Sequence, residues 1–419
     1  MTTRRQLLFG GAALAGLASG RAFANGTVLD DILNQSARDD WDGNYASGSA
    51  AGSSVGTTVP IFSDRTLRST LEAISSYRSI VAGGGWPVVP ANKTLKLGLE
   101  HPNVGALRRR LMVSGDLSTR AGLSDRYDTY VADAARRFQA RHGLPADGIL
   151  GKFSLAALNV PASIRLRQLE VNAERLAFRL MPDNRPQRRF VMVNIPGAEI
   201  EAVDNGRVGM RNTAIVGRPS RPTPILASKI YELNLNPYWH APKSIIRKDI
   251  IPLMRKDPNY LRDNRIRLYD AARNEVDPRS VNWQTDEAVQ YMFRQDPSAI
   301  NAMRSAKINF PNKHAVYLHD TPQQGLFDKL VRLESSGCVR VRNIRDLLTW
   351  LASETPGWGR RSLDGIIASG ENTDAKLAEP VGIHLDYVSA WSIQPGVVQF
   401  RDDVYGRDGE QELVIGTLG

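Results

Sequence analysis

The sequence predicts an α+β protein of several domains. A mostly-β domain with a helical insertion is expected to follow a small three-helix domain and helical scaffold segments. Apolar residues recur at helical spacing from about residue 101 to residue 180. After Arg189 the pattern changes to short β-rich runs separated by Gly, Pro and Asn. A chain of 419 residues is long enough for two or three domains with ordinary hydrophobic cores.

The first 24 residues are typical of an export signal. Arg4 and Arg5 precede an apolar, Gly/Ala-rich run, which ends in a small-residue cleavage pattern at 22–24. The order of residues 3–8 resembles a twin-arginine signal, which exports folded proteins. The alternative is an uncleaved anchor, but the run is shorter than the ~20 apolar residues that cross a bilayer. We therefore expect a periplasmic protein whose mature chain has no transmembrane segment.

The chain is basic, with a formal net charge of +10. The first 24 residues hold three arginines and no acid, so the remainder carries +7. That excess either favours anionic partners in the cell envelope or is simply a basic surface. The export signal and the lack of a recognised nucleic-acid-binding motif argue against nucleic acid as a partner.

Residues 25–100 are predicted to form an N-terminal scaffold region. The segment from Asn44 to Thr58 is mostly Gly, Ser and Ala, and we expect a flexible linker or loop because it can bury little apolar surface. A helix is predicted from Asp64 to Val81. It should end at the three glycines 83–85, which cannot continue a helix.

A small three-helix domain is predicted over residues 101–161. The order Phe-Gln, Gly-Leu, Asp-Gly and Gly within residues 133–151 resembles the peptidoglycan-binding module of wall enzymes, although an unrelated helical domain of this size is the alternative. A linking helix within 162–187 is expected to pack two domains together. The apolar stripes of the small domain are Val104, Leu107 and Leu111 on one helix and Val131, Ala135 and Phe138 on another.

The mostly-β domain is expected to run from residue 188 to residue 419. The stretch from about 242 to 309 is more helical and more charged, with helix candidates at 249–254 and 286–293, and is interpreted as an insertion. We expect the C-terminal strands to complete the sheet. The predicted strands cover residues 190–195, 213–216, 229–235, 315–319, 381–387 and 397–400.

One histidine and the single cysteine are the candidates for covalent chemistry. His319 ends a predicted strand, and Cys338 follows a Ser-Ser-Gly turn nineteen positions later. A catalytic thiol needs a nearby imidazole to take its proton. A lone cysteine cannot form an internal disulfide, so its thiol is either buried and inert or used. Likewise, His319 is either a base or a hydrogen-bonded structural residue.

The turn before the cysteine suggests a site for an oxyanion. Gly337 allows a tight turn and is expected to leave its N–H exposed. Together with the N–H of Cys338, and with that of Ser336 as a third candidate, it would stabilise the anion of a tetrahedral intermediate.

The order histidine, spacer, Ser-x-Gly-Cys and then Arg resembles the signature of the L,D-transpeptidase family. One departure is Ser336, which stands where many members have a second histidine and so removes that candidate base. Further segments resemble a large, multidomain subgroup with a capping insertion, and the likeness covers most of residues 188–419. These segments are 236–239, 247–252, 319–322, 380–381 and 400–405.

This resemblance implies an enzyme that forms peptidoglycan cross-links. Cys338 would attack the carbonyl at the L-centre of the third residue of a tetrapeptide stem, releasing D-alanine and forming a thioester that an amine of another stem resolves. His319 would accept the thiol proton and pass it to the leaving amine. The alternatives are a carboxypeptidase or cross-link hydrolase, or an inactive wall-binding scaffold.

Three further residues are candidates for binding the stem. Arg340 could pair with a substrate carboxylate, or could be a structural surface residue. Tyr317 and Trp239 could form pocket walls, or could belong to the core. No cofactor is implied, and the remaining histidines form no short metal-binding pattern. The group that orients His319 is left open.

Overall fold

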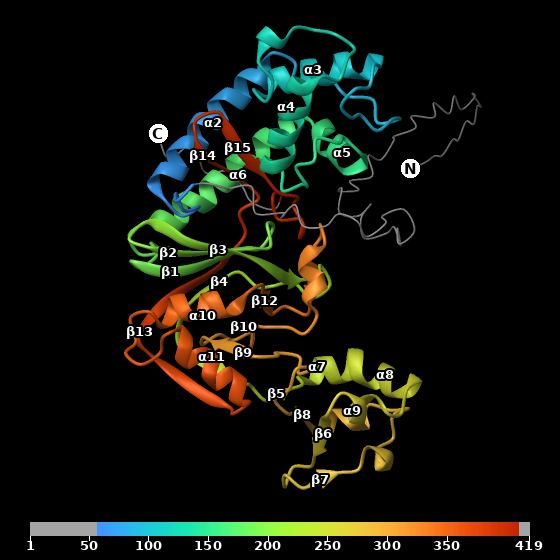
Figure 1. Cartoon of the computed structure of the whole chain (residues 1–419), viewed down its shortest axis with the longest axis vertical. Helices are drawn as coiled ribbons and strands as arrows, with labels where there is room; N and C mark the ends of the chain where they lie inside the picture. The colour runs from blue at the N-terminus through green and yellow to red at the C-terminus, as the bar shows by residue number, and fades with distance from the viewer. Residues whose placement is uncertain (1–56, 410–419) are drawn as a thin grey trace, which may run out of the picture.

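The computed structural model describes residues 57–409 (Figure 1). The expected export signal and most of the Gly/Ser-rich segment lie outside these residues. Three parts follow one another down Figure 1: a helical part with β14 and β15, a large mixed sheet, and a small α/β part at the bottom. Within the described residues, no helix combines the length and apolar character needed to cross a membrane.

The small helical domain contains α3 (Pro102–Val113), α4 (Thr129–Arg141) and α5 (Lys152–Asn159). The His101 side chain caps α3 and the Asp128 carboxylate caps α4, so each helix begins where a side chain accepts a free backbone N–H. All six residues of the two predicted apolar stripes are fully buried and share one core. The predicted helical stripes are confirmed.

Two long helices join this domain to the rest of the chain. α2 (Asp64–Ala82) and α6 (Ala162–Leu180) pack against each other and against a hairpin of β14 (Ala390–Gln394) and β15 (Val397–Phe400). The expectation that the last strand completes the main sheet is wrong. β15 pairs with β14, because their apolar residues are buried against α2 and α6 instead.

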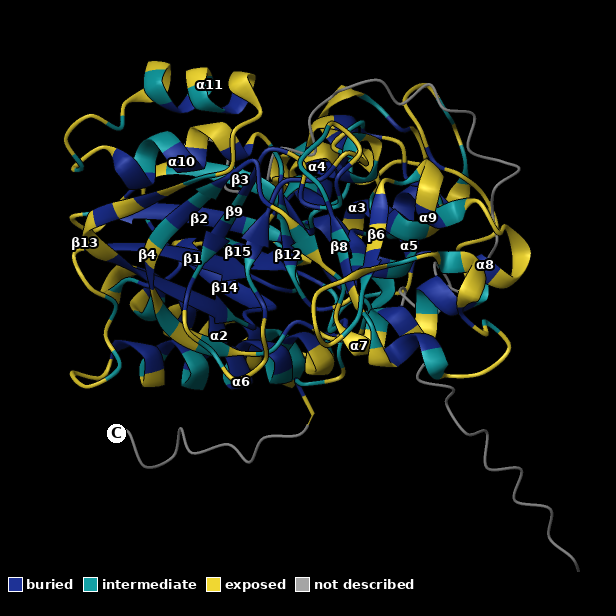
Figure 2. Cartoon of the chain, turned by 90° about the horizontal axis from the view of Figure 1, so that it is seen from below, coloured by how far each residue is buried: buried dark blue, intermediate teal, exposed yellow. Residues whose placement is uncertain are grey.

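The main sheet has nine strands in the order β11-β3-β12-β10-β9-β4-β13-β1-β2, and β2 also pairs with β3, so the sheet closes on itself. Helices α10 (Ile344–Ala352) and α11 (Arg360–Ser369) lie on one side of the buried strands and α2 and α6 on the other (Figure 2). The predicted mostly-β domain is confirmed. Its strands are β1 (Arg189–Asn194), β2 (Glu199–Asp204), β3 (Arg207–Gly217), β4 (Leu226–Leu235), β9 (Ala306–Asn309), β10 (Leu318–His319), β11 (Leu333–Ser335), β12 (Val339–Val341) and β13 (Thr373–Asp386).

The strand predicted over residues 315–319 is shorter in the structure. Only Leu318–His319 forms β10. The Asn312 side chain accepts the N–H of Val316 at 3.1 Å and donates to its carbonyl at 2.8 Å, so neither group is available to a neighbouring strand. Ala315 has a φ of 53°, which is turn geometry rather than strand geometry.

The inserted part, here called the cap (residues 239–305), is a small domain with its own core. It is less helical than predicted, because it contains a four-stranded sheet in the order β5-β8-β6-β7. The expected helix at 286–293 is a short 3-10 turn, Glu287–Gln290, followed by β8 (Met292–Gln295). The expected range of 242–309 also includes β9, which belongs to the main sheet. The other strands are β5 (Trp239–His240), β6 (Ile266–Tyr269) and β7 (Glu275–Val276).

The helices of the cap lie between β5 and β6. They are α7 (Lys243–Ile245), the π-helical turn η2 (Ile246–Ile250), α8 (Ile251–Lys256) and α9 (Tyr260–Asp263). The helix candidate at 249–254 falls in this continuous helical stretch and is confirmed. Its buried face is formed by Ile246, Ile250, Ile251 and Met254.

Candidate active site

The parallel strands β10 and β12 bring the candidate cysteine and histidine to one face of the sheet. Leu318 is opposite Val339, and both side chains are fully buried in the core. Because side chains alternate across a strand, their neighbours turn to the other face. A hydrogen bond of 3.1 Å from the Val339 N–H to the Tyr317 carbonyl extends the pairing to Cys338. The side chains that share this second face are Tyr317, His319, Cys338 and Arg340.

The His319 imidazole is buried and held by a backbone carbonyl. Its Nδ1 lies 2.5 Å from the Asp320 carbonyl oxygen. A carbonyl can only accept a hydrogen bond, so Nδ1 carries the proton and Nε2 presents its lone pair. The Asp320 carboxylate fixes this carbonyl in turn, since it accepts the Ser305 hydroxyl at 2.6 Å and the Thr321 N–H at 2.8 Å. The orienting group that the sequence left open is therefore the Asp320 carbonyl.

The protonation of His319 follows from its surroundings. Burial lowers its pKa to about 3, and the nearby cations Arg340 and Lys307 act in the same direction. The imidazole is therefore neutral in the resting site over the whole physiological range of pH.

Cys338 is a half-buried free thiol. Burial raises its pKa, while hydrogen bonds from the backbone and the side chain of Tyr317 and the charges of Lys307 and Arg340 oppose that shift. The resting site thus holds a neutral thiol and a neutral imidazole on the same face of the β10–β12 pair.

The nucleophile turn (residues 335–338) is held together by its own hydrogen bonds. Gly337 has a φ of 115°, which favours glycine. Its N–H donates to the Ser335 hydroxyl oxygen at 3.1 Å, and that hydroxyl donates to the Cys338 carbonyl. The expectation that the Gly337 N–H is exposed is therefore wrong for this conformation. The N–H groups of Cys338 and Ser336 stay predicted donors to an oxyanion.

A buried threonine ties the nucleophile turn to the main sheet. The Thr223 hydroxyl donates to the Gly337 carbonyl at 2.9 Å and accepts the Gly217 N–H at 2.8 Å. The Thr223 N–H in turn donates to the Tyr405 hydroxyl at 3.2 Å, and that hydroxyl donates to the Gly217 carbonyl. Thr223 and Tyr405 together fix the position from which the turn presents Cys338.

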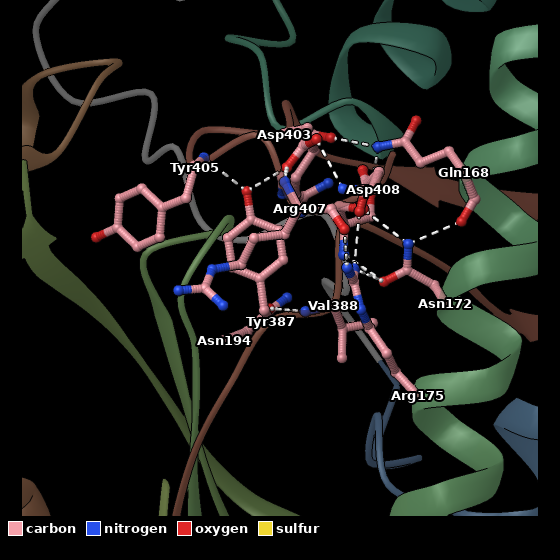
Figure 3. A network of polar contacts seen from close by, with 12 residues as sticks. Gln168, Asn172, Arg175, Asn194, Tyr387, Val388, Asp403, Tyr405, Arg407 and Asp408 are labelled. Carbon is pink, nitrogen blue, oxygen red and sulfur yellow. Dashed lines mark hydrogen bonds and ion pairs between the residues drawn. The ribbon is translucent and has the colours of Figure 1, made fainter. Parts of the chain in front are cut away.

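Figure 3 shows how this support continues to the helical part. The Tyr405 N–H donates to the Tyr387 hydroxyl at 2.8 Å, and that hydroxyl donates to Asp403 at 2.6 Å. Asp403 accepts the Asp408 N–H at 2.9 Å, and Asp408 pairs with Arg175 of α6 at 2.7 Å. The C-terminal segment that the family resemblance marked at 400–405 thus links α6 to the nucleophile turn.

The cap contacts the nucleophile turn through one arginine. Arg221 donates from the same nitrogen to the Ser336 hydroxyl at 2.9 Å and to the Asp249 carboxylate at 2.6 Å. Asp249 lies in η2 of the cap. The position of the cap is therefore coupled to the turn that carries Cys338.

The three predicted binding residues lie around the thiol. The Tyr317 ring centroid is 5.5 Å from that of His319, and the Tyr317 hydroxyl interacts with Cys338 and with Trp239 of β5. Arg340 is half-buried and donates to the Gln323 amide oxygen at 2.7 Å. All the predicted site residues therefore meet where the cap joins the main sheet, and their roles stay predictions.

Several residues of this region were missed from the sequence. Lys307 of β9 lies directly opposite His319 in the antiparallel register. The alternation of Ala306, Lys307, Ile308 and Asn309 is a strand signal, but these residues were assigned to the insertion. Nothing in the local pattern marks Thr223 or Arg221, since their contacts depend on how distant loops meet.

Comparison with known families agrees with this geometry. Residues 188–358 match the family model described as the L,D-transpeptidase catalytic domain. The chain contains an L,D-transpeptidase catalytic domain. Residues 100–158 match a second model, described provisionally as a peptidoglycan binding domain. The resemblances that the sequence motifs indicated are confirmed for both domains.

Relatives and solved structures carry the same family name. A Haemophilus influenzae protein, described provisionally as an L,D-transpeptidase, is 36% identical over 248 residues. The match covers 59% of this chain and 49% of the relative, so this chain spans about half the length of that relative. An L,D-transpeptidase structure from Xylanimonas cellulosilytica covers 71% of this chain and 99% of its own, at 18% identity and a TM-score of 0.23.

A structure from Stackebrandtia nassauensis covers 72% of this chain and 96% of its own, at 13% identity and a TM-score of 0.25. At TM-scores this low the overlays add nothing to the assignment, which rests on the sequence matches.

Proposed function

We propose that the protein is a periplasmic L,D-transpeptidase that cross-links peptidoglycan through a thioester on Cys338. The observation that supports this most strongly is the arrangement of the β10–β12 pair. It presents Cys338 and His319 on one face, and the bond from Nδ1 to the Asp320 carbonyl leaves the Nε2 lone pair of His319 free to act as a base.

The first half of the reaction forms the acyl-enzyme. The Cys338 sulfur attacks the carbonyl carbon at the L-centre of the third stem residue, and the thiol proton moves to Nε2 of His319. The carbon–nitrogen bond to the terminal D-alanine then breaks, and His319 returns the proton to the departing amine. The products are free D-alanine and a thioester.

The second half transfers the stem to an acceptor. The amine of a second stem attacks the thioester carbon, the carbon–sulfur bond breaks, and His319 takes a proton from the attacking nitrogen and returns one to the sulfur. The products are a new amide cross-link and the original thiol. Donor groups at the nucleophile turn, among them the Cys338 N–H, would stabilise the oxyanion of both intermediates.

The electrostatics of the site suit a concerted proton transfer. A thiol of raised pKa and an imidazole of lowered pKa are both neutral at rest. Charge then develops only as the sulfur attacks, when Arg340 and the backbone donors can stabilise it. The peptidoglycan-binding domain would hold the enzyme on its polymeric substrate, and the predicted export signal would place it in the periplasm.

The products of a reaction with muropeptides test this function. Purified protein is incubated with tetrapeptide-bearing muropeptides, and the products are separated and identified by mass spectrometry. We expect joined stems and one released D-alanine per cross-link, with both lost in Cys338→Ala. Shorter free stems without joined ones would instead indicate the hydrolase. A complete absence of both would leave the wall-binding scaffold, and the transpeptidase assignment would be wrong.

A further inference from the structure

Lys307 occupies a position beside the nucleophile that no motif predicted. In the register of the sheet, Lys307 of β9 is opposite His319 on one side and Asn234 on the other. Its neighbours Ala306 and Ile308 are fully buried in the core, so Lys307 faces the same way as His319. Its Nζ lies 4.5 Å from the centroid of the Tyr317 ring. The side chain therefore reaches from β9 across β10 toward Cys338.

The Lys307 ammonium is half-buried and, among residues 57–409, forms no ion pair with a carboxylate. The two acids whose charges act on it are already engaged by amides. Glu232 accepts from Asn309 at 3.1 Å, and Asp374 accepts from Asn234. A partly desolvated cation without a counter-ion is costly, and a bound anion would remove that cost.

The surroundings of Lys307 differ from those of Arg340, the other cation at this site. Arg340 lies on the far side of His319 in the same row of the sheet and already donates to Gln323. Lys307 lies next to β4, the strand that leads into β5 of the cap, and its ammonium faces the Tyr317 ring. A ligand between the cap and Cys338 would therefore lie near the Lys307 ammonium.

We propose that Lys307 binds the C-terminal carboxylate of the donor stem and so places the scissile carbonyl at Cys338. This inference rests on the proposed transpeptidase function. In the donor, the terminal carboxylate is separated from the scissile carbonyl by only the nitrogen and the α-carbon of D-alanine. A carbonyl at the sulfur therefore brings the carboxylate close to Cys338. Among the described residues, neither Lys307 nor Arg340 is paired with a carboxylate there, but Arg340 already donates to Gln323. Lys307 thus selects stems that end in a free acid.

A matched pair of donor stems tests the proposal. One is the tetrapeptide with its free C-terminal carboxylate, and the other is the same peptide ending in a carboxamide. Release of the terminal residue is measured with the parent enzyme, Lys307→Met, Lys307→Arg and the control Lys313→Met, which changes an exposed lysine of the following loop. Thermal unfolding of each variant checks that it is folded.

We expect the parent enzyme to prefer the acid over the amide in kcat/KM by about 10- to 100-fold, the usual worth of a hydrogen bond to a charged group. Lys307→Met should lower kcat/KM for the acid by that factor, mostly through KM, and leave the amide nearly unchanged. Lys307→Arg should keep most of the preference. Lys313→Met should behave as the parent enzyme does.

Two results would overturn the inference. If Lys307→Met slows both stems equally, Lys307 acts on the thiol and not on the carboxylate. If it changes neither, Lys307 has no part in binding. A parent enzyme that releases nothing from either stem would contradict the proposed function instead. Equilibrium binding of both stems to Cys338→Ala, with and without Lys307→Met, then still shows whether Lys307 distinguishes acid from amide.

Discussion

Cys338 and His319 lie on one face of the β10–β12 pair, and both are neutral at rest. Burial raises the pKa of the thiol and lowers that of the imidazole to about 3. Reactive cysteines in strongly electropositive sites behave differently, because their thiolate is already present at neutral pH. In this protein Lys307 and Arg340 supply positive charge, but burial has the larger effect on the sulfur.

The rate of alkylation of Cys338 should therefore rise steadily with pH. Because only the thiolate reacts with iodoacetamide, and because the thiol pKa is raised, we expect about a tenfold increase per pH unit from pH 6 upward, continuing past the ordinary thiol value of about 8.5. N-acetylcysteine under the same conditions is the control and should level off earlier. A plateau between pH 5 and pH 7 would indicate a thiolate–imidazolium pair and contradict this description.

At the scale of single residues, the sequence predicted the side chains better than their environment. A chemical pattern or a family motif marks five of the site side chains, so they could be named from the sequence: Cys338, His319, Tyr317, Arg340 and Trp239. The Asp320 carbonyl, which orients His319, could not be named from the sequence because a backbone carbonyl has no sequence signature. Lys307 could not be named either, because a cross-strand neighbour depends on the register. The N–H of Gly337 was assigned to an oxyanion although the neighbouring Ser335 hydroxyl accepts it.

Among the structural elements, the nucleophile turn depends most on a partner outside its own sequence. Thr223 is fully buried, and its hydroxyl donates to the Gly337 carbonyl while it accepts the Gly217 N–H. A hydrophobic residue of the same shape would leave both backbone groups buried without a partner. Each such loss costs about 1–3 kcal/mol.

Replacing Thr223 should therefore slow the reaction more than it perturbs the fold elsewhere. We expect Thr223→Val to lower kcat/KM for D-alanine release by about tenfold or more, since 1.4 kcal/mol corresponds to a tenfold change in rate. Thr223→Ser keeps the hydroxyl and should retain most of the activity. Equal activity of the Val and Ser variants in a D-alanine release assay would show that this hydroxyl does not position the turn.

The lengths of the elements also show where sequence patterns stop being informative. Helices α3 and α4 follow their apolar stripes, because the stripe and the buried face are the same feature. The strand expected at 315–319 is shortened by the Asn312 side chain, and β15 pairs with β14 away from the main sheet. Both differences arise from long-range or side-chain contacts, which apolar periodicity does not encode.

On the scale of the whole molecule, the cap and the main domain are joined next to Cys338. The Asp249–Arg221–Ser336 contact spans the junction, and Trp239 of the cap interacts with Tyr317 of the site. A closed cap would keep water away from a thioester until an amine acceptor arrives. The sequence predicted an insertion at this place, but neither its small sheet nor its attachment to the turn.

Weakening this contact should shift the fate of the thioester. Asp249→Asn removes the charge that holds Arg221. We expect the ratio of acyl-enzyme hydrolysis to transfer to rise by about twofold or more, because a charged pair of this kind contributes on the order of 1 kcal/mol. Asp286→Asn breaks an exposed ion pair with Arg247 in the same cap and is the matched control. An unchanged ratio of shortened to joined stems in Asp249→Asn would argue against a role for the cap.

The central claim is a thioester on Cys338, and the intact mass of the protein tests it most directly. The enzyme is mixed with tetrapeptide stems without an acceptor, and the reaction is quenched in acid. The intact mass of the protein is then measured by mass spectrometry, and the modified peptide is sequenced. We predict an added mass equal to the stem minus D-alanine, located on Cys338, absent in Cys338→Ala and strongly reduced in His319→Ala. No added mass on the parent enzyme, or an adduct on any other residue, would contradict the account.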